Sequence, residues 1–374
     1  MNKQILTVNL IKSQITRSNI IDVEVISFEG LYDFAKFHNV ANIVGKAIFE
    51  LGYADNCPDR DNFYAEQFDA AMNYQRQQYD LGRIHDVFEK EHICYVALKG
   101  AVIKGLYPEP EMRTSCDIDV LVKADDIERA QNALRKYLGA EYMCRSAHDV
   151  SYITDCGVHI ELHHTLCEKN YIGSNVLLSA WDYTIGEGYE KRFTNEFFVY
   201  YHYAHMAKHL VDGGFGIRLI SDLYLINKNM KFDKNELDRL LLQGTLKTFA
   251  DKATELSLVW FEQKPHNEST KMLEEYIFDS GIFGTLEHGV AVRKSSGGVV
   301  SGLFKRLFLP KERLAGEYPA LIKKPYLYLW YSLVRIAKSG FSKTTTEIKL
   351  VSSIDKQKKD AVNKMLKSLN INID

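Results

Sequence analysis

Two aspartates at alternate positions of an apolar run have the spacing that metal chemistry needs. Asp117 and Asp119 lie in the segment CDIDVLV. In a strand, alternate side chains leave the same face, about 6 to 7 Å apart along the backbone. Two carboxylates held this close repel each other, and placing both near a core is costly unless a cation neutralises them. The pair therefore predicts a site for a hard divalent cation with oxygen ligands.

A second polar strand face supplies a third carboxylate. Residues 158–163 (VHIELH) alternate apolar and polar side chains, which places His159, Glu161 and His163 on one face. If this strand pairs beside the Asp117 strand, Glu161 joins the two aspartates. Three carboxylates can hold two magnesium ions roughly 3.5 to 4 Å apart, the separation that serves in-line displacement at phosphorus. Magnesium is the expected cofactor, with manganese as the substitute, and His163 is expected to orient Glu161.

Residues upstream of the aspartates suggest phosphate binding. Lys99 and Gly100 end a β-rich run and open a helix-length segment, which would aim backbone N–H groups and the positive end of a helix at phosphate. Arg113 offers a guanidinium suited to phosphate oxygens. In the alternative to phosphate binding, Gly100 serves a simple turn, and Lys99 and Arg113 are ordinary surface charges.

Another group of candidates lies on later helices. His205 and His209 are four residues apart, so two imidazoles on one helical face can share a metal, and Asp222 can complete a ligand set. The glutamate of the HExxH motif is missing, which disfavours a metal-dependent hydrolase. A helical face packed on the sheet is favoured instead, with His205, His209, Arg218 and Asp222 in a buried polar network or lining the nucleotide cleft.

Hydrophobic periodicity predicts the elements that position these residues. Helical spacing extends from Val23 to about Glu91, with a break at residues 56–59, and returns beyond Thr194. Between them short strands and helices alternate, with strands predicted at 92–98, 117–122, 149–154 and 158–163 and helices at 101–107 and 125–138.

This alternation predicts an α+β fold, in which a small mixed sheet is flanked by N-terminal and C-terminal helical regions. We divide the chain into an N-terminal helical region, 1–90, an α/β core, 91–170, a C-terminal helical region, 171–300, and a basic and aromatic helical tail, 301–374. Residues 294–302 (KSSGGVVSG) are expected to form a loop. The aromatic and basic residues of the tail could dock RNA, an anionic acceptor or a membrane surface, or form an ordinary amphipathic helix.

Composition excludes several classes of protein. The 374 residues are 46% hydrophobic, enough for a sizeable core, and the net charge of −2 gives no global basic field for nucleic acid. The six cysteines form no CxxC pair, which argues against structural zinc and disulfides. Without a signal peptide or an apolar stretch of about 18 residues, we expect a cytoplasmic protein with no integral membrane segment.

Three segments together resemble the nucleotidyltransferase superfamily of the DNA polymerase β type. They are LKGA at 98–101, RTSCDIDVLV at 113–122 and IELH at 160–163. More narrowly, they resemble an uncharacterised bacterial nucleotidyltransferase family. The core resemblance covers about residues 90–170, with weaker similarity at 205–209, at 218–223 and in the late stretch from 309 to 335.

The resemblance implies a two-metal transfer of a nucleoside monophosphate from a nucleoside triphosphate. Asp117 and Asp119 would bind both magnesium ions, and Glu161 would bind the catalytic one and help deprotonate the acceptor. The same resemblance gives triphosphate binding to Lys99, Gly100, Ala101 and Arg113.

Ala101 departs from the family pattern, because members usually carry Gly or Ser there, and a hydroxyl contact is lost. The acceptor is unidentified: a small molecule, a sugar phosphate, a protein or an RNA end. A non-catalytic nucleotide-binding or regulatory module with the same fold is the main alternative, followed by the His205/His209 hydrolase.

Overall fold

A seven-stranded mixed sheet organises the computed structural model, which describes residues 2–18, 27–169, 171–282, 284–285, 292, 314, 318, 320–338 and 356–371. The strand order is β3-β4-β5-β2-β1-β7-β6, with β5 parallel to β2, β7 parallel to β1 and the other pairs antiparallel. The strands are β1 Tyr95–Ala97, β2 Asp117–Val122, β3 Glu141–Arg145, β4 Asp149–Ile153, β5 His159–His163, β6 Thr184–Ile185 and β7 Glu190–Phe193. The predicted α+β fold is confirmed.

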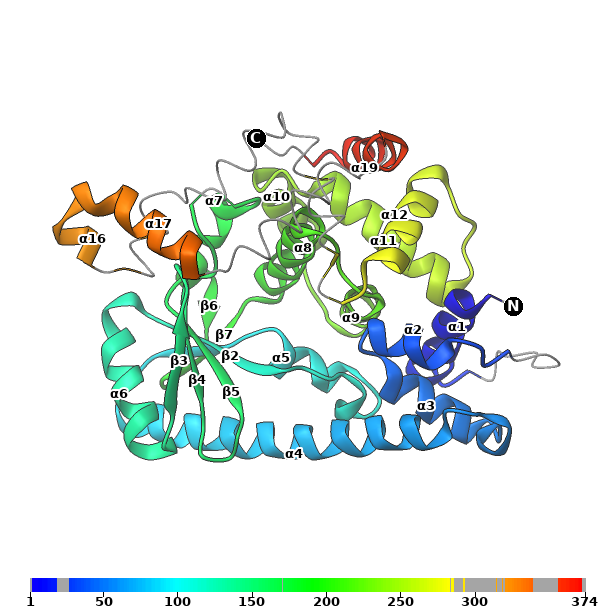
Figure 1. Ribbon diagram of the computed structural model, residues 1–374, viewed down its shortest axis with the longest axis horizontal. Coiled ribbons are helices and arrows are strands. Elements are labelled where there is room, and N and C mark those ends of the chain that lie inside the picture. The colour runs from blue at the N-terminus through cyan, green and yellow to red at the C-terminus, as the bar shows by residue number, and fades with distance from the viewer. Residues whose placement is uncertain are drawn as a thin grey trace.

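Two helices cover one face of the sheet. Helix α4, Arg60–Lys90, runs along the sheet at the base of the molecule, and α6, Ile127–Leu138, lies beside it (Figure 1). The core on this face joins Phe88 of α4 and Leu134 of α6 to Val120 and Ile160 of the sheet, all fully buried. Burial of each such side chain contributes about 1.5–3 kcal/mol, so this face anchors β2 and β5.

The N-terminal helices precede α4 in the chain. They are α1 Lys3–Thr16, α2 Leu31–Phe37 and α3 Ala41–Glu50, followed by a 3₁₀ turn at Ala54–Asn56. Helix α4 then begins at Arg60, so the predicted break at residues 56–59 is confirmed. Gly45 of α3 leaves room for α4, because a Cβ there would lie 2.8 Å from the Cβ of Phe63.

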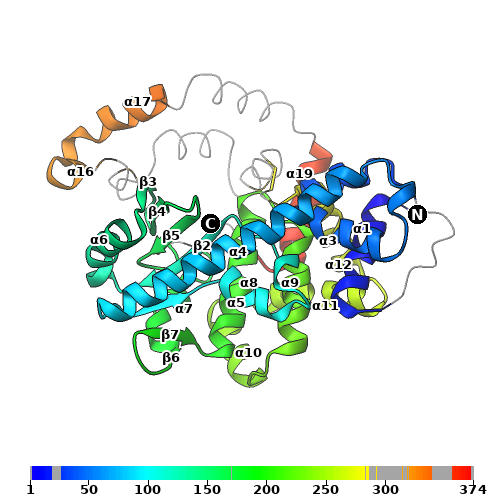
Figure 2. The same cartoon turned by 90° about the horizontal axis from the view of Figure 1, so that it is seen from below.

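A larger helical core lies over the opposite face of the sheet. Its helices α8, α9, α10, α11 and α12 gather around buried aromatic residues, and α11 also packs on α1 (Figure 2). Their bounds are α8 Asn195–Asp212, α9 Ile217–Asn229, α10 Lys234–Gln243, α11 Lys247–Glu262 and α12 Glu268–Ser280. The remaining helices are short or late: α5 Gly100–Ile103, α7 Ser174–Leu177, α16 Ala320–Lys323, α17 Tyr328–Lys338 and α19 Lys356–Ser368.

Three strands were not predicted from the sequence. Every residue of β3 is exposed, so this edge strand has no alternation to reveal it, and β6 and β7 are short. Because β7 pairs with β1, the sheet extends past residue 170, and the four-part division of the chain stays a prediction. The loop at 294–302 and much of the 301–374 tail lie outside the described residues, although α17 is present and its Trp330 is 63% exposed.

Two expectations from composition can be compared with the structure. All six cysteines are free. None of the helices in the described part of the chain combines the length and apolar character that crossing a membrane requires.

Candidate active site

The three carboxylates predicted from the sequence meet on one face of the sheet. Strands β2 and β5 run parallel, with Asp119 opposite Glu161 and Asp117 opposite His159. A ligand oxygen of Glu161 lies within 4.8 Å of one on Asp117, and the same holds for Asp119. The apolar residues between them turn to the α4 side, so the alternation expected from sequence positions all three acids together.

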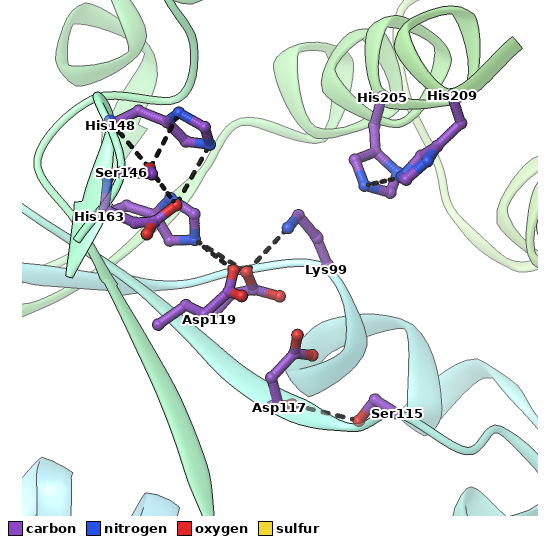
Figure 3. A network of polar contacts seen from close by, with 11 residues as sticks. Lys99, Ser115, Asp117, Asp119, Ser146, His148, His163, His205 and His209 are labelled. Atoms are coloured by element: carbon purple, nitrogen blue, oxygen red, sulfur yellow. Dashed lines mark hydrogen bonds and ion pairs between the residues drawn. The ribbon is translucent and has the colours of Figure 1, made fainter. Parts of the chain in front are cut away.

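Asp119 is the most enclosed of these acids and is held by two basic groups. Figure 3 shows Lys99 and His163 approaching it from two sides, and both Lys99 Nζ and His163 Nε2 lie 2.8 Å from Oδ1. His163 Nε2 is also 3.5 Å from an oxygen of Glu161. Burial alone would raise the pKa of Asp119, but the Lys99 charge and the His163 contact hold it well below its ordinary value.

Asp117 is in a different electrostatic position. Burial and then the charge of Asp119 raise its pKa above the ordinary value, and Glu161 adds to this effect. An ionised Asp117 is therefore unfavourable in the folded protein. Like charges brought together in this way are stabilised by a bound cation.

The loop before α5 brings Lys99 and Gly100 to the same place. Lys99 has φ 41° and ψ −108°, a strained conformation of the kind that clusters at functional sites. Gly100 leaves room for Arg113, because a Cβ there would lie 2.6 Å from Nη1 of that side chain. The N–H of Ala101 donates to the carbonyl of Leu98 at 3.1 Å, so this amide serves the turn.

Arg113 lies at the cavity wall but is buried and paired. Its Nη2 is 3.0 Å from Oδ2 of Asp222, and Nε is 3.2 Å from both carboxylate oxygens. The hydroxyl of Tyr107 donates to Asp222 Oδ1 at 2.8 Å. Asp222 therefore belongs to a buried polar network that joins the segment before β2 to α9.

His205, His209 and Arg218 form the opposite wall of the site. The Nε2 atoms of the two histidines are 3.0 Å apart, so one ring donates to the other. Burial, then the Lys208 charge, lowers the pKa of His209 to about 3. Arg218 Nη1 donates to the carbonyl of Thr114 at 2.7 Å, while its buried Nε has no hydrogen-bond partner.

Sequence reasoning missed three residues of the site: His148, Asp149 and Lys208. Asp149 pairs with His163 across β4 and β5, and His148 Nε2 lies 3.2 Å from Asp149 Oδ2. Alternating polar positions in the segment DVSYI could have placed Asp149 on the face of Glu161. Nothing in the sequence distinguishes Lys208, which follows His205 by three residues on α8.

A cavity of about 340 Å³ unites these groups between the sheet and helices α8 and α9. The carboxylates lie on the sheet side, and the histidine pair lies on the helical side, as Figure 3 also shows. Its lining includes every predicted site residue except Ala101 and Asp222: Lys99, Gly100, Arg113, Asp117, Asp119, Glu161, His163, His205, His209 and Arg218.

The carboxylate end of the cavity suits a hard divalent cation. Two groups of three potential ligands include Glu161, one with Asp117 and His159 and the other with Asp119 and His163. Carboxylate oxygens predominate in this donor set, which is the chemistry that magnesium and manganese prefer. The histidine pair, by contrast, belongs to no group of three such ligands among the described residues.

Comparison with known proteins agrees with this geometry. No curated protein and no solved structure matches the chain. The model of a protein family described as uncharacterised nucleotidyltransferase matches residues 25–262, a range that contains the sheet, the cavity lining except Ile282, and all the predicted site residues. Because this match covers more than half of the chain, the protein belongs to the uncharacterised nucleotidyltransferase family, which indicates a role in nucleotidyl transfer.

Proposed function

We propose that the protein transfers a nucleoside monophosphate from a nucleoside triphosphate to an acceptor hydroxyl or phosphate. The observation that carries this proposal is the register of β2 and β5, which sets Asp119 opposite Glu161 and brings Asp117 within reach. Bound at these three carboxylates, two magnesium or manganese ions would lower the pKa of an acceptor hydroxyl and neutralise charge on the phosphates.

The protein's own side chains have separate tasks in this reaction. The acceptor oxygen forms a bond to the α-phosphorus, the bond from that phosphorus to the bridging oxygen breaks, and pyrophosphate leaves. Glu161 accepts the proton of an acceptor hydroxyl, because 26% of its side chain is accessible, against 4% for Asp119. His163 fixes the orientation of Asp119 through its 2.8 Å contact.

Triphosphate binding falls to the basic residues near β2. Lys99 is the strained residue before α5, and Arg113 and Arg218 line the same cavity. Among the described residues, Lys99 and Arg113 each pair with a carboxylate and Arg218 does not, so Arg218 is the best suited of the three to take a phosphate oxygen.

A direct assay tests the proposal. The protein is incubated with magnesium, each α-phosphate-labelled nucleoside triphosphate and fractionated cell extract, and label transfer is followed. We expect Asp117→Asn, Asp119→Asn and Glu161→Gln each to reduce transfer by at least about 100-fold, and EDTA to abolish it. The exposed Asp125→Asn, on the turn after β2, serves as the matched control.

One observation favours the alternative of a non-catalytic nucleotide-binding module. Asp119 is already neutralised by Lys99 and His163, a contact that a structural carboxylate would also make. Triphosphate binding without label transfer in any fraction would support the module and contradict the enzyme. The His205/His209 pair has no third metal ligand in the described part of the chain, which disfavours the hydrolase hypothesis. Stoichiometric zinc or iron in the purified protein would support that hypothesis.

A further inference from the structure

Some basic side chains that line the cavity form an ion pair with a carboxylate, and others do not. Lys99 is neutralised by Asp119, and Arg113 by Asp222. Lys208 and Arg218 line the same cavity, and neither has a carboxylate within ion-pair distance among the residues that the structure describes. Burial and the Lys99 charge lower the pKa of Lys208 although Asp212, Asp149 and Glu168 act against them, so a further anion beside its ammonium group would be favourable.

These two cations have different neighbours in the cavity. Arg218 is bonded to the carbonyl of Thr114, so it stands where β2 begins. Lys208 Nζ lies 5.0 Å from the centre of the Tyr171 ring. Burial is the main cause that lowers the pKa of His148 to about 4, and the Lys208 charge is the next, which places Lys208 near His148.

His148 marks the β4–β5 end of the cavity. Its ring stacks on that of His163, with the ring centres 5.9 Å apart. His163 lies 2.8 Å from Asp119 and 3.5 Å from Glu161, so the surroundings of Lys208 adjoin the carboxylates. The Arg218 end adjoins Gly100 and Arg113, where the triphosphate is proposed to bind.

We infer that Lys208 anchors a separate acceptor subsite, and that the acceptor carries an oxyanion of its own, a phosphate or a carboxylate. The inference rests on the proposed function and deepens it. The ammonium group of Lys208 is a compact charge with three donors, which suits such an oxyanion. An acceptor held there presents its nucleophilic oxygen beside Glu161, while the triphosphate is gripped from the other end.

Calorimetry with small anions tests this subsite. The protein is saturated with magnesium and a non-hydrolysable nucleoside triphosphate, and inorganic phosphate or acetate is then titrated. We expect saturable binding of at least one anion, weakened about 10-fold or more by Lys208→Met and restored in part by Lys208→Arg. Affinity for the triphosphate should change less than about 2-fold in Lys208→Met.

Lys228→Met is the matched control. Lys228 lies 5.3 Å from the centre of the Tyr224 ring, the same kind of contact that Lys208 makes, but outside the cavity lining. We expect it to leave anion binding unchanged. Circular dichroism and a thermal melt of each variant exclude misfolding as the cause of lost binding.

The outcomes separate this inference from the proposed function. If neither anion binds the triphosphate-saturated protein while label transfer persists, the acceptor subsite is wrong and the nucleotidyltransferase stands. If Lys208→Met instead weakens triphosphate binding by 10-fold or more, Lys208 grips the nucleotide, and the inference is again overturned. A protein that neither binds triphosphate nor transfers label overturns both.

Discussion

The two faces of strands β2 and β5 differ in almost every physical respect. Toward α4 and α6 they present Val120 and Ile160, fully buried in an apolar core. Toward α8 the same strands present Asp117, Asp119 and Glu161, acids that repel one another. The comparison teaches that burial on the apolar face stabilises the sheet enough for the other face to carry acids that reduce stability.

Placing a charge on the apolar face should give the largest effect. Val120→Asp puts a carboxylate among fully buried side chains without a cation, and we expect it to reduce the free energy of unfolding by about 3–5 kcal/mol. Urea denaturation measures this loss. Ala124→Asp, at an exposed position just after β2, should stay within about 0.5 kcal/mol of wild type, and equal losses in the two variants would erase the distinction between the faces.

Acid should weaken the wall of the cavity opposite the carboxylates. His209 has a pKa of about 3 in the folded protein, lowered chiefly by burial from an ordinary value of 6.5. Below pH 6.5 the unfolded chain binds a proton that the folded ring refuses, so the stability from neutral His209 is complete above that pH and is lost as the pH falls toward 3. The slope is up to about 1.4 kcal/mol per pH unit.

In His209→Gln the unfolded chain can no longer take up a proton at this position. As the pH is lowered, the free energy of unfolding of the variant should fall less steeply than that of wild type. Urea denaturation at pH 6.5, 5.5 and 4.5 measures both. Parallel curves for the two proteins would mean that the ring is not buried in its neutral form.

Crowding the turn before α5 should have an intermediate effect. A Cβ on Gly100 would lie 2.6 Å from Nη1 of Arg113, whose guanidinium is held by Asp222, so Gly100→Ala should cost about 1–3 kcal/mol. It should also reduce label transfer, because Lys99 and Asp119 adjoin the same turn. Gly105→Ala, where a Cβ meets nothing within 4 Å, should leave both unchanged, and a neutral Gly100→Ala would show that Arg113 can move aside.

The smallest expected effect is a gain in stability. Because burial and Asp119 raise the pKa of Asp117, its ionised form is destabilising at pH 7, and Asp117→Asn should add about 1 kcal/mol in EDTA. The gain should shrink as the pH falls below the raised pKa of folded Asp117, and it should be gone below 3.8, where the unfolded carboxyl also takes up a proton.

Magnesium sharpens the Asp117 test. Added to wild type it should raise the melting temperature, and added to Asp117→Asn it should do so much less, because binding to the folded state alone stabilises it. A destabilised Asp117→Asn in EDTA would argue that the acid is a structural residue.

Much of the sheet could be predicted from local pattern. Alternation predicted β2 and β5, and the shared face of Asp117, Asp119 and Glu161 followed once these strands were assumed to pair. The edge strand β3 could not be found, since all its residues are exposed. Local periodicity carries no information on a strand that buries neither face.

The partners of the basic residues could not be predicted either. Arg113 was expected to hold phosphate, but the side chain that pairs with it, Asp222, is 109 positions away in the sequence. Likewise Lys99 contacts Asp119 only because β1 and β2 are neighbours. Such contacts depend on tertiary packing, which spacing within one segment does not encode.

Arg113–Asp222 and Arg218–Thr114 have a consequence for how substrates enter. Both links tie the segment before β2 to α9, so spreading the cavity walls would break a buried ion pair, at a cost of about 3–5 kcal/mol if one partner is lost. The distance between the segment before β2 and α9 is therefore set by folding and does not depend on ligand binding. A ligand must therefore fit the space that these two links leave between the segment before β2 and α9.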